Sequence, residues 1–288
     1  MAATQRITSF QRAGLTFDVT DQGPLDGEVI ILLHGFPQSS SSWNELAPLL
    51  HAEGYRTLAP NQRGYSPRAR PKGRLAYRLK ATTEDALALI NVVGQGHPVH
   101  VIGHDWGAAV AWSLASTHPE AVKTLTALSV PHPAAFMRSL FTSTQFLRSW
   151  YMFAFQIPWL PEQVALWLAR TSRPRMITGM AATGQTAVNA ARDIDYMTTP
   201  GTLTAAMNWY RAMPFGSPSQ LRRIKVPTLY IYSDKDTALG PKAAKLTANY
   251  ITAPYTFHTL KGIGHWIPEQ APKEVAALLH PHLSRHHT

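Results

Sequence analysis

Short runs of consecutive apolar residues alternate along this chain with longer segments in which apolar residues recur at helical spacing. The short runs predict buried strands at residues 29–33, 55–59, 99–103, 125–130, 227–232 and 255–260. The longer segments predict helices at residues 43–51, 83–93, 106–116, 241–250 and 269–279. Strands that are apolar on both faces, with helices between them, are typical of an α/β fold with a mostly parallel sheet flanked by helices.

The alternation is interrupted at residues 133–216, which are rich in aromatic residues and methionine and contain no convincing buried strand. We interpret this segment as a helical cap inserted into a core made of residues 1–132 and 217–288. Such an insertion lies over the crevice where sheets of this kind bind ligands. Its most apolar part, residues 150–169, contains two prolines and a glutamate, so we expect it to line a covered pocket and not to span a membrane.

The composition is that of a folded globular chain, since 45% of the 288 residues are hydrophobic and 15% are charged. The absence of cysteine excludes disulfides, thiolate metal sites and cysteine nucleophiles. Residues 1–14 contain no apolar run of signal-peptide length, and we therefore expect a soluble, cytoplasmic protein.

The formal net charge is +10, and the basic excess is concentrated in residues 63–80, where no acidic residue intervenes. Basic stretches of this kind occur in proteins that bind nucleic acids or anionic surfaces. Here no motif that reads nucleic acid accompanies the charge. We therefore expect a solvated loop that leads into a helix, and no nucleic-acid partner.

The most informative segment reads Val101-Ile102-Gly103-His104-Asp105-Trp106-Gly107-Ala108, in which a predicted strand meets a predicted helix with almost no loop. Gly-x-Asp-x-Gly has the layout of a nucleophile elbow, which usually carries serine at its centre. The glycines allow a sharp turn and a close approach of helix and strand. A carboxylate is ionised at neutral pH and can displace a leaving group from saturated carbon, which gives an alkyl ester. Asp105 could also be a simple helix cap, but the glycines and the strand favour a nucleophile.

A second motif, His34-Gly35-Phe36-Pro37, follows an earlier predicted strand. In folds with a nucleophile elbow, this loop supplies one N–H group of an oxyanion hole and the residue after the nucleophile supplies the other. The backbones of Phe36 and Trp106 are therefore the predicted donors. Losing one such donor typically lowers the rate by about 10²–10³-fold.

The expected order of groups in such a site is nucleophile, acid, histidine. Asp234 and Asp236 both follow a late predicted strand, and we prefer Asp236 as the acid that orients the histidine. His265 follows the last predicted strand and a Gly-x-Gly turn, which distinguishes it among 13 histidines. We expect a frayed terminus, and not a metal site, at His280, His282, His286 and His287.

These motifs resemble those of the α/β-hydrolase superfamily, and specifically of its epoxide hydrolase branch. The resemblance covers nearly the whole chain, and the segments that carry it are His34-Gly35-Phe36-Pro37, Gly103-His104-Asp105-Trp106-Gly107, Asp236, Gly264-His265, Trp150-Tyr151-Met152-Phe153 and Asn208-Trp209-Tyr210-Arg211. In that family, a tyrosine from each of two cap segments donates a hydrogen bond to the epoxide oxygen. Tyr151 and Tyr210 match those positions.

The resemblance implies an α/β-hydrolase fold and an enzyme that opens an epoxide to a vicinal diol without a cofactor or a metal. Asp105 attacks the epoxide while the two tyrosines hold its oxygen, and water activated by His265, with Asp236 behind it, hydrolyses the ester. The implied partners are a small hydrophobic epoxide and water, without stable membrane insertion, in a monomer or a homodimer. The candidate pocket walls are Phe36, Trp106, Phe155 and Trp266.

One segment departs from the family pattern. Epoxide hydrolases commonly have an aspartate and a further glycine where this chain reads Asn61-Gln62-Arg63-Gly64-Tyr65-Ser66-Pro67. We interpret this segment as a peripheral loop with structural residues near Arg63, so the departure leaves the catalytic assignments in place.

Three other functions fit parts of the pattern. Haloalkane dehalogenases share the aspartate nucleophile and the adjacent tryptophan, but here Phe36 stands where they often have asparagine, and the paired tyrosines have no role. Fluoroacetate dehalogenases share the His-Gly-Phe-Pro loop but favour arginine after the nucleophile. A catalytically silent binding protein does not need the complete set of catalytic residues.

Overall fold

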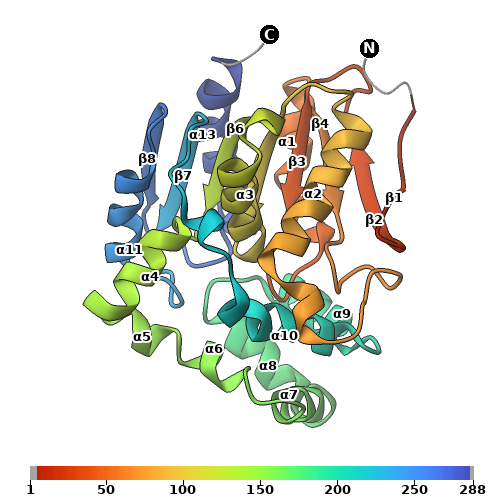
Figure 1. Cartoon of the computed structure of the whole chain (residues 1–288). Coiled ribbons are helices and arrows are strands. Elements are labelled where there is room, and N and C mark those ends of the chain that lie inside the picture. The colour runs from red at the N-terminus through yellow and green to blue at the C-terminus, as the bar shows by residue number, and fades with distance from the viewer. Residues whose placement is uncertain (1–4, 286–288) are drawn as a thin grey trace.

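The computed structural model describes residues 5–285, which form an eight-stranded sheet covered by helices (Figure 1). The strands are β1 (Ser9–Arg12), β2 (Leu15–Gln22), β3 (Val29–Leu33), β4 (Arg56–Pro60), β5 (Val99–His104), β6 (Val122–Leu128), β7 (Thr228–Ser233) and β8 (Tyr255–Leu260). They stand in the order β1-β2-β4-β3-β5-β6-β7-β8. The pairs β1–β2 and β2–β4 are antiparallel, and the other neighbouring strands are parallel.

The core helices lie on both faces of the sheet (Figure 1). They are α1 (Ala47–Ala52), α2 (Leu79–Val93), α3 (Trp106–Thr117), α11 (Pro241–Leu246), α12 (Ile267–Gln270) and α13 (Pro272–Ser284). Alternate residues of β3 serve the two faces: Ile31 and Leu33 pack in the cluster that includes α2 and α3, and Ile30 and Leu32 pack in the cluster that includes α1 and α13. The predicted α/β fold with a mostly parallel sheet is confirmed.

Between β6 and β7, a stretch that is described throughout, the chain forms helices and no strand. The helices are α4 (Pro133–Thr142), α5 (Gln145–Arg148), α6 (Trp150–Ala154), α7 (Leu160–Thr171), α8 (Arg173–Ala181), α9 (Ala187–Thr198) and α10 (Thr202–Ala212). In Figure 1, α6 to α10 gather at the carboxyl ends of the parallel strands. We refer to residues 133–216 as the cap, and their division from the core as a separate domain stays a prediction.

All six predicted strands are present, as β3 to β8, but the hairpin of β1 and β2 was not predicted. Because these strands stand at the sheet edge, they alternate apolar and polar residues and lack a continuous apolar run. Ala13 and Gly14 form the turn at positive φ, 50° and 75°. Phe10 and Phe17 stack across the pair with ring centroids 4.7 Å apart.

The last helix corrects one prediction. His280 and His282 lie in α13, which continues to Ser284, so they do not belong to a frayed terminus. The ring Nδ1 of His280 is 2.9 Å from Glu53 Oε2. The proline at position 281 is accommodated inside this helix. His286 and His287 lie outside the described residues.

The basic stretch at residues 63–80 is solvated only in part. Arg63 is buried and donates two hydrogen bonds of 2.7 Å to the Asp85 carboxylate. Arg70 donates to the backbone oxygens of Gly64, Tyr65 and Pro200 at 2.9, 3.0 and 2.8 Å. The expectation of a solvated loop is therefore wrong for these two side chains, which fasten the loop to the protein. The absence of a nucleic-acid partner stays a prediction.

The apolar segment at residues 150–169 lines a cavity, but the fold covers it incompletely. Leu166, Leu168 and Ala169 are among its cavity-lining residues. Trp150 and Trp159 are each 67% exposed. Within residues 5–285, none of the helices has both the length and the apolar character needed to cross a membrane.

Candidate active site

The site is built around a turn of one residue between β5 and α3. β5 ends at His104, α3 begins at Trp106, and Asp105 between them has φ +51°, an uncommon value for an L residue. A Cβ atom on Gly107 would lie 1.9 Å from the Leu33 carbonyl oxygen, and one on Gly103 would lie 2.3 Å from the Gly107 oxygen. Glycine is therefore required at both positions for the helix to start this close to the sheet.

The Asp105 carboxylate points toward the His34-Gly35-Phe36-Pro37 loop and makes no capping bond to its own helix, which sets aside the interpretation of Asp105 as a cap. Its Oδ1 accepts a hydrogen bond of 2.8 Å from the Phe36 N–H. A Cβ atom on Gly35 would lie 2.3 Å from the Asp105 Cβ, so only glycine permits this approach. Trp106 is the first residue of α3, where backbone N–H groups have no acceptor within the helix.

Gln62 forms two hydrogen bonds to His34, the first residue of the loop that carries Phe36. Its backbone N–H donates to His34 Nε2 at 3.1 Å, and its side-chain nitrogen donates to the His34 carbonyl oxygen at 2.5 Å. Burial lowers the pKa of His34 to about 4, so the ring is neutral and can accept this bond. The segment that departs from the family pattern is therefore not peripheral, because it supports the loop that carries Phe36.

His265 lies between two carboxylates. Its Nε2 is 3.5 Å from Asp105 Oδ2, and its Nδ1 is 2.8 Å from Asp236 Oδ2. The other oxygen of Asp236 accepts the N–H groups of Ala238 and Leu239 at 2.8 and 2.9 Å. Of the two candidate acids only Asp236 reaches the ring, since Asp234 is exposed and accepts a hydrogen bond from Gly262 instead.

The charges of these three groups stabilise one another. Burial raises the pKa of Asp236, but His265 and the hydrogen bonds to the carboxylate lower it to about 2. Burial also lowers the pKa of His265, and the carboxylates of Asp236 and Asp105 outweigh this effect and raise it above the ordinary histidine value. For Asp105, the contacts with His265 outweigh burial and lower its pKa. An imidazolium between two carboxylates is therefore favoured at neutral pH.

Two cap helices place phenol groups opposite Asp105. Tyr151 belongs to α6 and Tyr210 to α10, and their ring centroids are 6.0 Å apart. The Tyr210 ring also meets Phe36 and Trp106 at centroid distances of 5.5 and 5.0 Å. Burial raises the pKa of both phenols, and the negative charge of Asp105 adds to this effect. Both hydroxyl groups therefore keep their protons.

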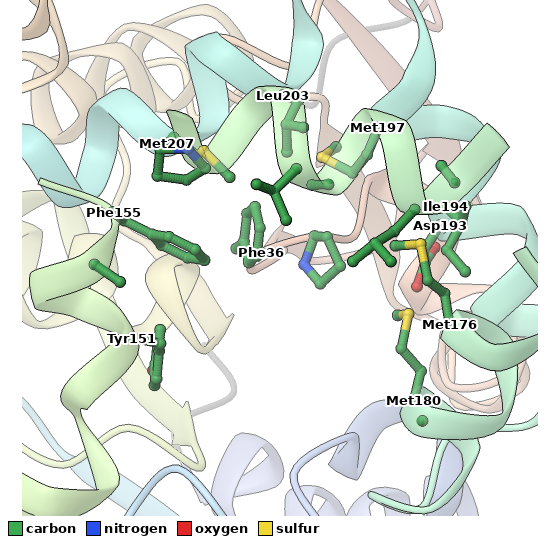
Figure 2. A pocket seen from close by; sticks show the side chains of 18 of the residues that line it. Phe36, Tyr151, Phe155, Met176, Met180, Asp193, Ile194, Met197, Leu203 and Met207 are labelled. Carbon is green, nitrogen blue, oxygen red and sulfur yellow. The ribbon is translucent and has the colours of Figure 1, made fainter. Parts of the chain in front are cut away.

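Two apolar cavities meet at these groups. The larger is about 730 Å³ and the smaller about 420 Å³. Asp105, Tyr151 and Tyr210 line both of them, and His265 lines the larger. Figure 2 shows the larger cavity, with Tyr151 and Phe155 on one side and Met176 and Met180 on the other.

The four predicted pocket walls are distributed between the two cavities. Phe36, Phe155 and Trp266 line the larger cavity, and Trp106 lines the smaller. Their contact with a substrate stays a prediction.

Comparisons with known proteins agree with this geometry. Residues 28–272 match the family described as alpha/beta hydrolase fold. Over 92% of its length, the chain is 35% identical to an AB hydrolase superfamily protein of Bacillus subtilis, covering 93% of that protein. It is 32% identical to epoxide hydrolase A of Mycobacterium tuberculosis, with 96% of each chain covered. The chain belongs to the epoxide hydrolase family of the α/β-hydrolase superfamily.

Solved structures of this family support the same conclusion. The epoxide hydrolase of Bacillus megaterium, solved in complex with an inhibitor, superposes with a TM-score of 0.81 at 26% identity. The match covers 96% of this chain and 99% of that one. Epoxide hydrolase A of Mycobacterium thermoresistibile gives a TM-score of 0.79 at 26% identity and covers 96% of this chain and 97% of that chain.

Sequence reasoning missed one polar residue at the centre of this epoxide hydrolase fold. Ser129 follows β6, and its Oγ lies 2.7 Å from Asp236 Oδ2 and 3.0 Å from His265 Nδ1. Ser129 follows a buried strand directly, at the same sheet edge as Asp105. This position could have indicated that its side chain belongs to the site.

The cap also fixes the loop that carries Asp236. Gln145 of α5 donates to the Ala238 carbonyl oxygen and accepts from the Gly240 N–H, both at 2.7 Å. Arg148 donates to the Asp236 carbonyl oxygen at 3.0 Å. Because these contacts join residues about 90 positions apart, nothing in the local sequence could indicate them.

Proposed function

We propose that this chain hydrolyses an epoxide to a vicinal diol through a covalent ester on Asp105. The observation that carries the proposal is that the Asp105 carboxylate and the phenols of Tyr151 and Tyr210 line the same two apolar cavities. A nucleophile and two proton donors are thus available to one bound ring. Relatives named epoxide hydrolase support the same reaction.

The first step joins the substrate to the protein. Asp105 Oδ2, whose neighbouring Oδ1 is held by Phe36, attacks one carbon of the epoxide. The carbon–oxygen bond of the ring breaks, and its electron pair stays on the epoxide oxygen. Tyr151 and Tyr210 donate hydrogen bonds to this oxygen, and one of them supplies the proton. The products are a neutral hydroxyalkyl ester and a tyrosinate, and the tyrosinate regains its proton, by way of water, from the His265 imidazolium, which leaves His265 neutral.

The second step releases the diol. His265 Nε2 takes a proton from water, and the water oxygen attacks the carbonyl carbon of the ester. Oδ1 becomes an oxyanion, which accepts hydrogen bonds from the backbones of Phe36 and Trp106. Asp236 stabilises the imidazolium. Collapse of the oxyanion breaks the bond between the carbonyl carbon and the alkyl oxygen and leaves a carboxylic acid and an alkoxide. The proton of the acid passes to the alkoxide, so that Asp105 returns to a carboxylate and His265 to an imidazolium. Substrate and water alone balance this reaction.

The charge of Asp105 couples the two steps. In the free protein two carboxylates raise the pKa of His265, so the ring is protonated. Alkylation turns Asp105 into a neutral ester and removes one of those charges. The pKa of His265 then falls, and the ring becomes a base only when there is an ester to hydrolyse.

The proposal is tested by trapping the ester. His265→Gln keeps the bulk of the side chain but removes the base, so incubation with styrene oxide should add one hydroxyalkyl group to the peptide that contains Asp105. Mass spectrometry of the digested protein measures the adduct, and His265→Gln/Asp105→Asn is the matched control. An unmodified peptide after prolonged incubation contradicts the covalent route. Bromide release from a bromoalkane by the wild-type protein, without diol from any epoxide, assigns haloalkane dehalogenation instead.

A further inference from the structure

The reacting groups stand at the junction of two cavities, and not at the end of one. Asp105, Tyr151, Tyr210 and Ala238 line both cavities. The larger extends into the cap toward Met176 and Met180, as Figure 2 shows. The smaller extends the other way, between α4, α10 and the residues that follow α10. Each has a volume, 730 and 420 Å³, within the range of about 300–1,000 Å³ that ligand pockets usually show.

The only cationic side chain among the described walls of the two cavities is the His265 imidazolium, which already lies between two carboxylates. Among the described residues, no lysine or arginine lines either one. Among the described residues that line the smaller cavity, Asp105 is the only carboxylate. The larger contains His265 together with Asp105 and Asp193, and His265 is already engaged by carboxylates. A carboxylate on a bound molecule would therefore find no counter-ion.

The far end of the larger cavity adds negative charge. Asp193 accepts from Arg192 Nε at 2.8 Å, and Arg192 also binds Glu269 at 2.6 Å. Two buried carboxylates thus share one guanidinium. In Figure 2, Asp193 stands beside Ile194 and Met176, away from Tyr151. An anionic substituent that reached this end would meet like charge in apolar surroundings, which is unfavourable.

We propose that the natural substrate is an uncharged epoxide that carries an apolar substituent on each of its two ring carbons. This inference rests on the proposed function. The ring lies at the junction, where Asp105 and the two phenols reach it, and one substituent fills each cavity, the bulkier one on the His265 side. A terminal epoxide leaves one cavity without a substituent and forfeits the apolar contacts that this cavity offers.

The size requirement is tested with a pair of aromatic epoxides. The ratio kcat/KM for stilbene oxide, in its faster isomer, should exceed that for styrene oxide by at least tenfold. If the protein hydrolyses styrene oxide but neither isomer of stilbene oxide, the inference is wrong and the proposed function still holds. Absence of diol from every epoxide overturns the proposed function itself.

Matched variants show whether both cavities are occupied. Ala109→Leu in α3 narrows the smaller cavity, and Ala165→Leu in α7 narrows the larger. Each should lower kcat/KM for stilbene oxide about tenfold more than for styrene oxide, because the terminal epoxide can place its ring in the unaltered cavity. If either variant fails to fold, the more exposed Leu221→Trp and Val164→Trp replace them. An equal effect of the smaller-cavity variant on both substrates contradicts the inference.

The charge requirement is tested with trans-3-phenylglycidate and its amide. The two molecules share the ring and the phenyl group and differ in one negative charge. We expect kcat/KM for the amide to be at least 30-fold higher than kcat/KM for the carboxylate. The rates are measured by chromatography of the diol products. Equal rates, or a preference for the carboxylate, contradict the assignment of an uncharged substrate.

Discussion

The hydroxyl of Ser129 donates a hydrogen bond of 2.7 Å to Asp236 Oδ2, from a backbone position with φ +70°. Few residues other than glycine adopt such a conformation. The neighbouring strand holds it there, because the Ser129 N–H donates to the Ile231 oxygen at 2.9 Å and the Tyr230 hydroxyl donates to the Ser129 oxygen at 2.8 Å. The strained backbone therefore fixes the hydroxyl beside the acid that faces His265.

Replacement of Ser129 by alanine should change the pH dependence of turnover. The hydroxyl stabilises the Asp236 charge, so its loss leaves that carboxylate more strongly coupled to His265 and raises the pKa of the histidine in the ester intermediate. Because the ester is hydrolysed only by neutral His265, the acidic limb of the kcat profile should move to higher pH. A steady-state pH series on a soluble epoxide measures this shift. If the acidic limb of the kcat profile lies at the same pH in Ser129→Ala and in the wild type, Ser129 does not influence the pKa of His265.

Ser129→Gly is the matched control for folding. It removes the same hydroxyl but relieves the positive φ, so it should be about 1 kcal/mol more stable than Ser129→Ala. Urea denaturation compares the two. If both variants share the pH shift despite this difference in stability, the shift belongs to the hydroxyl and not to damage of the fold.

The two cap tyrosines should act in alkylation and not in hydrolysis of the ester. Tyr151→Phe and Tyr210→Phe each leave one donor for the epoxide oxygen, and we expect losses in kcat/KM of about 10- to 100-fold. The double variant should lose about 10⁴-fold, the upper range for general acid catalysis. Added to His265→Gln, the double substitution should slow adduct formation on Asp105 to the same extent. Normal adduct formation in that triple variant would remove the tyrosines from the mechanism.

Gly35→Ala tests the approach of the loop to the nucleophile. The new methyl group would lie 2.3 Å from the Asp105 Cβ, so either the Asp105 side chain or the Phe36 N–H must move. We expect kcat to fall at least 100-fold, the loss typical for an oxyanion donor. Gly73→Ala, which lines neither cavity and whose Cβ meets nothing within 4 Å, is the control: its φ of +80° should cost about 1 kcal/mol of stability while kcat stays unchanged. Retained turnover in Gly35→Ala contradicts the role of this contact.

The parts of the site that the sequence predicted are those encoded within a few consecutive residues. The turn at Asp105 needs glycine on both sides, and β5 and α3 adjoin it, so motif and structure coincide. His265 and Asp236 follow strands at the same sheet edge, which the parallel topology brings together. Buried strands give continuous apolar runs, and for that reason β3 to β8 were recognisable.

The parts that were missed depend on contacts between distant segments. Gln145 has no local signature, and its role arises only because α5 packs against the loop after Asp236. Ser129 is an ordinary residue in sequence and acquires its role from its positive φ and two partners far along the chain. Gln62 was assigned to a peripheral loop because its contact with His34 spans two strands.

A buried ion pair at the sheet edge should contribute strongly to stability. Arg56 Nε donates to Asp21 Oδ1 at 2.9 Å, and both side chains are almost fully buried. Burial raises the pKa of Asp21, but the bonds from Arg56 and from the Ile7 N–H outweigh it and lower the pKa. Asp21→Asn removes the negative charge that balances the buried guanidinium, which also donates to the Gln5 carbonyl oxygen at 3.1 Å, and we expect the free energy of unfolding to fall by about 3–5 kcal/mol at pH 7.

The pH dependence of this contribution follows from the lowered pKa. The unfolded chain binds a proton at Asp21 below about pH 4, where the folded chain still holds a carboxylate. The contribution of Asp21 is therefore complete above that pH and declines as the pH falls further. Urea denaturation at pH 7 and pH 3 should show a smaller difference between wild type and Asp21→Asn at the lower pH. A double-mutant cycle with Arg56→Met isolates the pair, and a coupling energy near zero at pH 7 contradicts this account.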